Sequence, residues 1–97
     1  MKRKRESIVR AATPDGQRAG EALIETIENQ LRLNDPPEAR EALERLLDLG
    51  ETRENAMRYL GSVLATEVFY TLKNNEAFNR ERYVGNLRAL PELPDDE

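Results

Sequence analysis

The chain of 97 residues contains no cysteine, no histidine and no tryptophan. Without cysteine, disulfides and thiolate metal sites are excluded. Without histidine, the chain lacks the commonest metal ligand and the commonest general base near neutral pH. We therefore expect no catalytic site, no cofactor and no bound metal, so the chain is not predicted to be an enzyme.

Long apolar runs are also missing. No run approaches the roughly 18 residues of a membrane-spanning helix. The lysines and arginines at positions 2–5 resemble the start of a signal peptide, but no apolar segment follows them. We expect a cytoplasmic protein that does not associate with a membrane.

The composition is that of one small folded domain. Hydrophobic residues make up 38% of the chain and charged residues 35%, which is polar but too rich in aliphatic residues for complete disorder. A domain of this size buries only part of its surface and has a marginal core. We therefore expect a homodimer, because a second copy would bury further apolar surface.

The charge is unevenly distributed, because residues 1–18 carry a net +4 and residues 19–97 a net −8. A basic arm on an acidic body is therefore predicted. The arm residues that we consider for contact with nucleic acid or another anionic partner are Lys2, Arg3, Lys4, Arg5 and Arg10. The alternative, which the sequence favours, is a solubilising tail.

Helix-start signals divide the first half of the chain into two helices. Thr13 is a predicted cap, and Pro14 the first residue, of a helix over residues 14–33. Asp35 is predicted to cap a second helix with Pro36 at its first position, because a residue before proline leaves the helical region. Gly50 supplies the left-handed turn that ends this second helix.

A third helix is predicted from a cap at Thr52 to about Lys73. Its apolar positions cover more than one face, which indicates a central helix contacted from two sides. These positions are Ala56, Met57, Leu60, Val63, Leu64, Val68, Phe69 and Leu72. Gly61 is unfavourable inside a helix by about 1 kcal/mol. Gly61 and Ala65 therefore indicate a packing position, where the first helix approaches through Ile27 and Leu31.

The rest of the chain predicts one more helix. Asn74 and Asn75 end the third helix, because asparagine tolerates the left-handed conformation. Asn79 can cap a short helix to about Leu90. The sequence thus predicts an all-α, four-helix domain over residues 13–90, with a long central third helix, disordered termini, a mobile basic arm at residues 1–12 and an acidic tail at residues 91–97.

Three local patterns suggest chemistry, and each has a plainer interpretation. Glu21, Glu25 and Glu28 share one helix face and could bind a hard cation, but a solvated acidic face is the favoured reading. Ser62 has no histidine to activate it and is interpreted as a packing residue. The helices around Gly50 could form a helix-turn-helix that presents Arg53, Asn55 and Arg58 to DNA; the acidic body argues against this.

Two segments resemble a group of short, uncharacterised, bacterial all-helical proteins. They are Asp35-Pro36-Pro37, preceded by residues 28–31, and Gly61-Ser62-Val63-Leu64, preceded by residues 53–58. Members of this group often carry histidine where this chain has Ile24, Glu54 and Arg58. The resemblance implies an ancestral metal site between the first and third helices, at which Glu54 and Arg58 can here form a salt bridge instead.

The function that follows from these observations is a small non-enzymatic interaction or accessory module that self-associates. Phe69 and Tyr70, on the apolar third helix, are the candidate interaction residues of the body. Two alternatives stay open: a nucleic-acid accessory protein that uses the basic arm, and a protein with a degenerate metal site. The sequence identifies no other protein partner.

Overall fold

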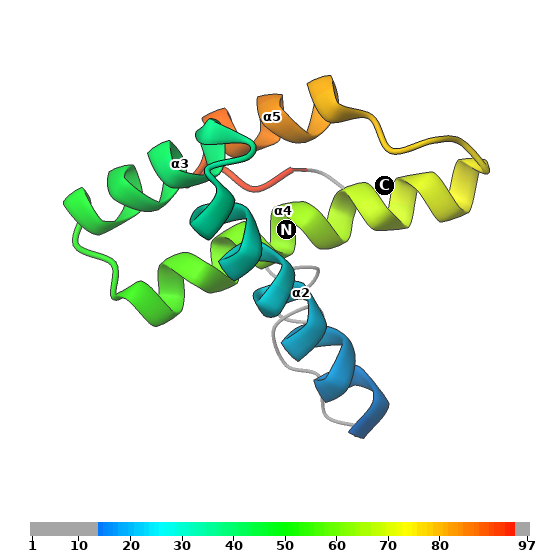
Figure 1. Ribbon diagram of the computed structural model, residues 1–97, viewed down its shortest axis with the longest axis horizontal. Helices are drawn as coiled ribbons and strands as arrows, with labels where there is room; N and C mark the ends of the chain where they lie inside the picture. The colour runs from blue at the N-terminus through cyan, green and yellow to red at the C-terminus, as the bar shows by residue number, and fades with distance from the viewer. Residues whose placement is uncertain (1–13, 95–97) are drawn as a thin grey trace.

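The computed structural model describes the backbone of residues 14–94 and the side chains of residues 18–94. Its helices are α2 (Pro14–Leu33), α3 (Pro37–Asp48), α4 (Arg53–Asn74) and α5 (Arg80–Ala89). The predicted all-α, four-helix fold with a longest third helix is confirmed (Figure 1). The predicted arm (residues 1–12), the Thr13 cap and residues 95–97 of the predicted tail lie outside the described residues.

Helix α4 is the centre of the packing, because α2, α3 and α5 all contact it. Helix α3 also contacts α5 and α2, so the shorter helices close around one side of α4. The core takes side chains from all four helices: Ile27, Leu31, Ala39, Ala42, Leu43, Leu46, Ala56, Met57, Leu60, Val63, Leu64, Tyr83, Leu87 and Leu90.

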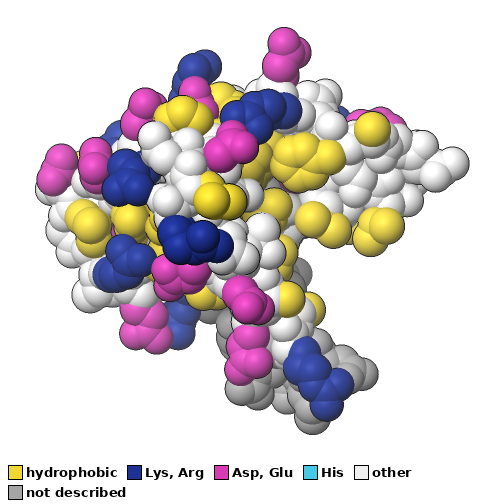
Figure 2. All heavy atoms as spheres, in the orientation of Figure 1, with side chains coloured by type: hydrophobic (Ala, Val, Ile, Leu, Met, Phe, Trp, Pro, Cys, Tyr) yellow, Lys and Arg dark blue, Asp and Glu magenta, His cyan; other side chains and the backbone are white. Residues whose placement is uncertain are grey.

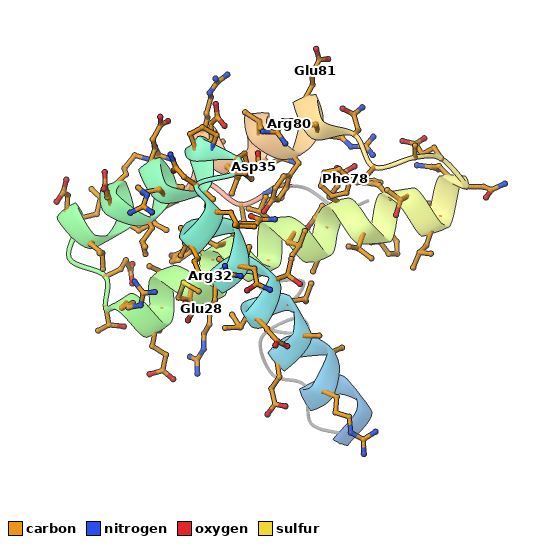
Figure 3. All side chains as sticks on the ribbon, viewed as in Figure 1. Glu28, Arg32, Asp35, Phe78, Arg80 and Glu81 are labelled. Carbon is orange, nitrogen blue, oxygen red and sulfur yellow. The ribbon has the colours of Figure 1, made fainter. Side chains whose placement is uncertain are left out.

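The start of α3 differs from the prediction. The helix begins at Pro37, and the cap position is held by Pro36 in an extended conformation with no side-chain hydrogen bond. Asp35 is therefore not the cap, since two successive prolines move the helix start one residue further and keep the residue before Pro37 extended. The Asp35 carboxylate instead accepts a hydrogen bond of 2.9 Å from Arg80, in the first turn of α5 (Figure 3).

The other predicted helix ends are confirmed. The Thr52 hydroxyl accepts a hydrogen bond of 3.0 Å from the Asn55 amide, and the Asn79 side chain accepts one of 3.0 Å from the Arg82 amide. After α3, Gly50 has a φ of +100°, and Asn75 ends α4 with a φ of +52°. Local chemistry was sufficient to predict these four positions.

Five side chains lie in surroundings other than those predicted. Leu47, on the apolar stripe of the second helix, was expected to be buried but is 39% exposed. Val68, Phe69 and Leu72 were expected on contacted faces of the third helix but are 39%, 46% and 78% exposed. Leu93, placed in the acidic tail, is half-buried against the core. The errors in α4 arise because α2 crosses this helix near Gly61 and then diverges from it (Figure 1).

Candidate interaction surface at the end of α4

The two halves of α4 have different surroundings. From Ala56 to Leu64 nearly every residue is buried, and this is the half of α4 that α2 crosses (Figure 1). Past Glu67, only the side that carries Glu67 is covered, by the start of α5 and the segment before it. In Figure 1 the last turns of α4 project beyond the crossing with α2. The projecting half therefore leaves apolar side chains in contact with solvent.

Glu67 fixes the covered side of this projecting half. Its side chain is fully buried and accepts hydrogen bonds from Arg82 at 2.8 and 3.0 Å and from the Asn79 amide at 2.9 Å. Arg82 also donates to Glu76 at 3.0 Å. Since Asn79 caps α5, one carboxylate of α4 holds both the cap and the first turn of α5.

The buried carboxylate is stabilised in its charged form. Burial alone raises the pKa of Glu67, but the Arg82 hydrogen bonds, the Asn79 amide and the positive charge of Arg82 outweigh burial and lower that pKa. The pKa of Arg82 is raised, chiefly by its hydrogen bond with Glu67. A buried charge is tolerated only when it is paired and hydrogen-bonded, and here every contact fixes structure.

Close to the Glu67–Arg82 pair, Tyr83 of α5 joins this helix to α2. The buried hydroxyl of Tyr83 donates a hydrogen bond of 2.8 Å to the Gln30 side chain. Phe78 lies edge-on to the Tyr83 ring, with 5.3 Å between the ring centroids. Burial raises the pKa of Tyr83 to about 12, although the hydrogen bond with Gln30 opposes that rise. This tyrosine is therefore a neutral structural residue.

The uncovered side of the projecting half is apolar. We call it the open stripe, and it consists of Ala65, Val68, Phe69 and Leu72. Ala65 and Leu72 each lie three and four residues from the central pair Val68 and Phe69, so the four side chains share one face of the helix. Phe69 is 46% exposed and Leu72 78% exposed, whereas Ala65 is half-buried. The Lys73 ammonium lies 5.6 Å from the centroid of the Phe69 ring, at the edge of the stripe.

The stripe is open because α2 leaves α4. At the crossing, a Cβ built on Gly61 would lie 3.4 Å from Cδ1 of Ile24. Val68 and Leu72 continue the face that begins at Gly61, at helical spacing. Beyond the crossing the N-terminal half of α2 diverges (Figure 1), and Figure 2 shows a hollow between the two projecting ends, with hydrophobic side chains on the α4 edge.

The open stripe also lacks charge. Residues 68–72 contain no charged side chain, in a chain of which 35% is charged. A solvated helix face normally carries charged residues at this spacing. An exposed, uncharged face with an aromatic residue is typical of a surface that another protein covers.

The structure places the predicted packing and interaction residues close together. Gly61 is buried against α2 as expected, but its neighbour there is Ile24, and a Cβ at position 61 would have ordinary contacts. Phe69 lies on the open stripe. Tyr70 lies on the other side, with Arg82 over its ring at 5.0 Å and Phe69 edge-on at 5.9 Å. Lys2, Arg3, Lys4 and Arg5 lie outside the described residues.

The residues considered for DNA contact are engaged within the domain. Arg53 pairs with Glu28 of α2 at 3.3 Å, and Asn55 donates to Glu51 at 3.4 Å. Arg58 pairs with Glu54 at 3.2 Å, which is the salt bridge expected for those two positions. All of these contacts are exposed, so each ion pair contributes little stability.

The described residues offer neither a metal site nor a membrane-spanning helix. Residues 18–94 contain no group of three or more acidic, histidine or cysteine side chains that could hold a metal ion, and Glu21, Glu25 and Glu28 do not form one. Among helices α2 to α5, none is long and apolar enough to cross a bilayer.

Two structural anchors were missed by the sequence analysis. Glu67 is the only charged residue between Arg58 and Lys73. A single carboxylate in an otherwise uncharged stretch of helix indicates a buried ion pair, so the sequence did contain a signal for this anchor. Arg45 donates hydrogen bonds of 2.8 and 2.7 Å to the carbonyls of Leu90 and Leu87 at the end of α5. Nothing in the local sequence pointed to this second anchor, because the two segments are far apart in the chain.

The comparisons with known proteins add no assignment. No family model matches the chain, and neither a curated protein nor a solved structure is significantly similar to it. The resemblance to short bacterial helical proteins therefore stays a prediction.

Proposed function

We propose that this protein is a non-enzymatic protein-interaction module that self-associates through the open stripe of α4. The observation that carries the proposal is Leu72, a leucine 78% exposed on a face that also exposes Phe69 and Val68. Scattered exposed leucines are ordinary, but a continuous apolar face marks an interaction surface.

Among the described residues, the two buried titratable side chains, Glu67 and Tyr83, support a binding role over a catalytic one. The buried acid, Glu67, is saturated by Arg82 and the Asn79 amide, and the buried Tyr83 is bonded to Gln30. Both groups hold helices together and have no proton to exchange with a substrate near neutral pH. On the projecting end of α4, the exposed side chains between Glu67 and Lys73 are the apolar Val68, Phe69 and Leu72.

Self-association is tested by mass in solution. At micromolar concentration, analytical ultracentrifugation should give roughly twice the chain mass of 11.1 kDa. Leu72→Glu should weaken the dimer by at least about ten-fold, since a buried unpaired carboxylate costs more than 1.4 kcal/mol. The matched control is Leu49→Glu, because Leu49 is 62% exposed at the corner after α3.

The two variants separate the stripe from general surface hydrophobicity. Dissociation by Leu72→Glu, with Leu49→Glu still dimeric, supports the proposal. A wild-type chain that stays monomeric at several hundred micromolar overturns it, as does a dimer that Leu72→Glu leaves intact. Circular dichroism melts of both variants establish that the domain itself remains folded.

A further inference from the structure

We infer that the self-association is two-fold, with the projecting ends of α4 antiparallel and Leu72 of each copy packed beside Ala65 of the other. This inference rests on the proposed function and adds the geometry of the partner. A two-fold interface places the same patch on both sides, so the patch must be complementary to itself. The order of residue sizes along the stripe meets this requirement.

The size pattern fixes the direction of pairing. The stripe begins with the small Ala65 and ends with Leu72, and Val68 and Phe69 lie between them. In an antiparallel pair centred between positions 68 and 69, position 72 of one copy faces position 65 of the other. A large side chain then meets a small one at both ends, as close packing of helices requires. A parallel pair would place Leu72 against Leu72 and Ala65 against Ala65.

Helix α2 completes the contact. From Ala65 to Leu72 the stripe is only about 10 Å long at 1.5 Å per residue, which is short for an interface that buries roughly 800 Å² per partner. Antiparallel pairing directs the tip of the second α4 towards the hollow beside α2 (Figure 2). The half-buried Leu23 and Ile24 of α2 extend the apolar surface there. An end-to-end contact of the two tips would not reach α2.

The rim of the stripe is compatible with this arrangement. The Lys73 ammonium lies 5.6 Å from the centroid of the Phe69 ring, at the edge of the stripe, where a long charged side chain can keep its head group in water when the stripe is covered. Glu67 and Glu76 are both held by Arg82 on the opposite side of the helix. The two copies therefore bring no carboxylates together along the stripe.

Side-chain size can be exchanged to test the register. Leu72→Ala leaves a gap at both contacts, and Ala65→Leu introduces a clash at both, so each variant alone should dimerise at least about ten-fold more weakly. Mixed together, the two variants place alanine against leucine at both contacts. Sedimentation of the equimolar mixture should return to within about three-fold of the wild-type dissociation constant.

A cysteine test does not depend on the folding of Ala65→Leu. The chain has no native cysteine, so Ala65→Cys and Leu72→Cys each introduce a unique thiol. A mixture of the two should form the heterologous disulfide on mild oxidation. Either variant alone should not, because like positions would lie about 10 Å apart along the antiparallel axis and a disulfide needs Cα atoms within about 7 Å.

The outcomes are distinguishable from those of the proposed function. A monomeric wild-type chain overturns self-association and this geometry together. A wild-type dimer whose mixed size variants are not rescued, and whose Leu72→Cys chains cross-link with each other, overturns the antiparallel register alone. Rescue in the mixture together with the heterologous disulfide supports the register.

Discussion

Glu67 offers the most direct measurement of what holds the projecting half of α4 to α5. We expect Glu67→Gln to destabilise the domain by about 2–3 kcal/mol. Hydrogen bonds to charged groups contribute about 1.5–3 kcal/mol each, and loss of one partner of a buried pair costs about 3–5 kcal/mol. The lower part of this range applies because Arg82 is 30% exposed and keeps Glu76, and because glutamine still offers the Asn79 amide an acceptor.

Urea and thermal unfolding followed by circular dichroism measure this loss. For a domain of this size, about 1 kcal/mol corresponds to about 4–8 °C in Tm, so a fall of about 8–24 °C is expected. The control is Glu81→Gln, because Glu81 points away from the domain in Figure 3 and pairs with no described residue. That variant should stay within about 0.5 kcal/mol of wild type. An equally small effect of Glu67→Gln would refute the anchor.

The stability difference between wild type and Glu67→Gln should depend on pH. The pKa of Glu67 lies below its ordinary value of 4.5 in the folded state, so the unfolded chain takes up this proton first as pH falls. The stabilisation is complete above the unfolded pKa and is lost as pH falls through the folded one. The stability difference between wild type and Glu67→Gln should therefore shrink below about pH 4.5. A difference that is constant down to pH 3 would contradict this assignment.

Two further substitutions test packing and burial. Gly61→Ala should stabilise the domain by several tenths of a kcal/mol, since helix propensity favours alanine by about 1 kcal/mol and its Cβ meets only the tip of Ile24 at 3.4 Å. Gly61→Leu should cost about 1–3 kcal/mol in denaturant melts, and a harmless leucine would place Gly61 outside the helix contact. Tyr83→Phe should cost about 0.5–1.5 kcal/mol. The Tyr83 pKa of about 12 exceeds the unfolded value of about 10, so stability should fall as pH rises between these values, and the fall should be absent in Tyr83→Phe.

Helix positions and ends could be predicted because their causes are local. Thr52, Asn79, Gly50 and Asn75 each act on backbone groups within a few residues, and all four have the predicted role. Asp35 shows the limit of this reasoning. Asp35 was predicted to cap the second helix from the same chemistry, but the Pro36-Pro37 pair moves the helix start by one residue. The Asp35 carboxylate accepts a hydrogen bond from Arg80 instead, 45 residues away in the chain.

Contacts between distant segments could not be predicted in this way. Arg45 and Arg40 both donate to carbonyls at the ends of other helices, at 2.7–2.8 Å for Leu90, Leu87 and Leu31. A helix pattern identifies these arginines only as polar positions on an amphipathic helix. Their partners depend on where α2 and α5 end relative to α3, which is settled by the packed core and not by local propensity.

The open stripe depends on the same distinction between periodicity and coverage. The apolar pattern indicated that Val68 and Leu72 lie on faces of the third helix that other helices contact, and that Gly61 and Ala65 form a packing position. Burial, however, depends on the angle at which α2 crosses α4. Because α2 touches α4 at Gly61 and then diverges, one uninterrupted apolar pattern is core at its start and surface at its end. The apolar side chains beyond the crossing lie outside the core of a single chain, and a second copy of the chain packed on them would account for their apolar character.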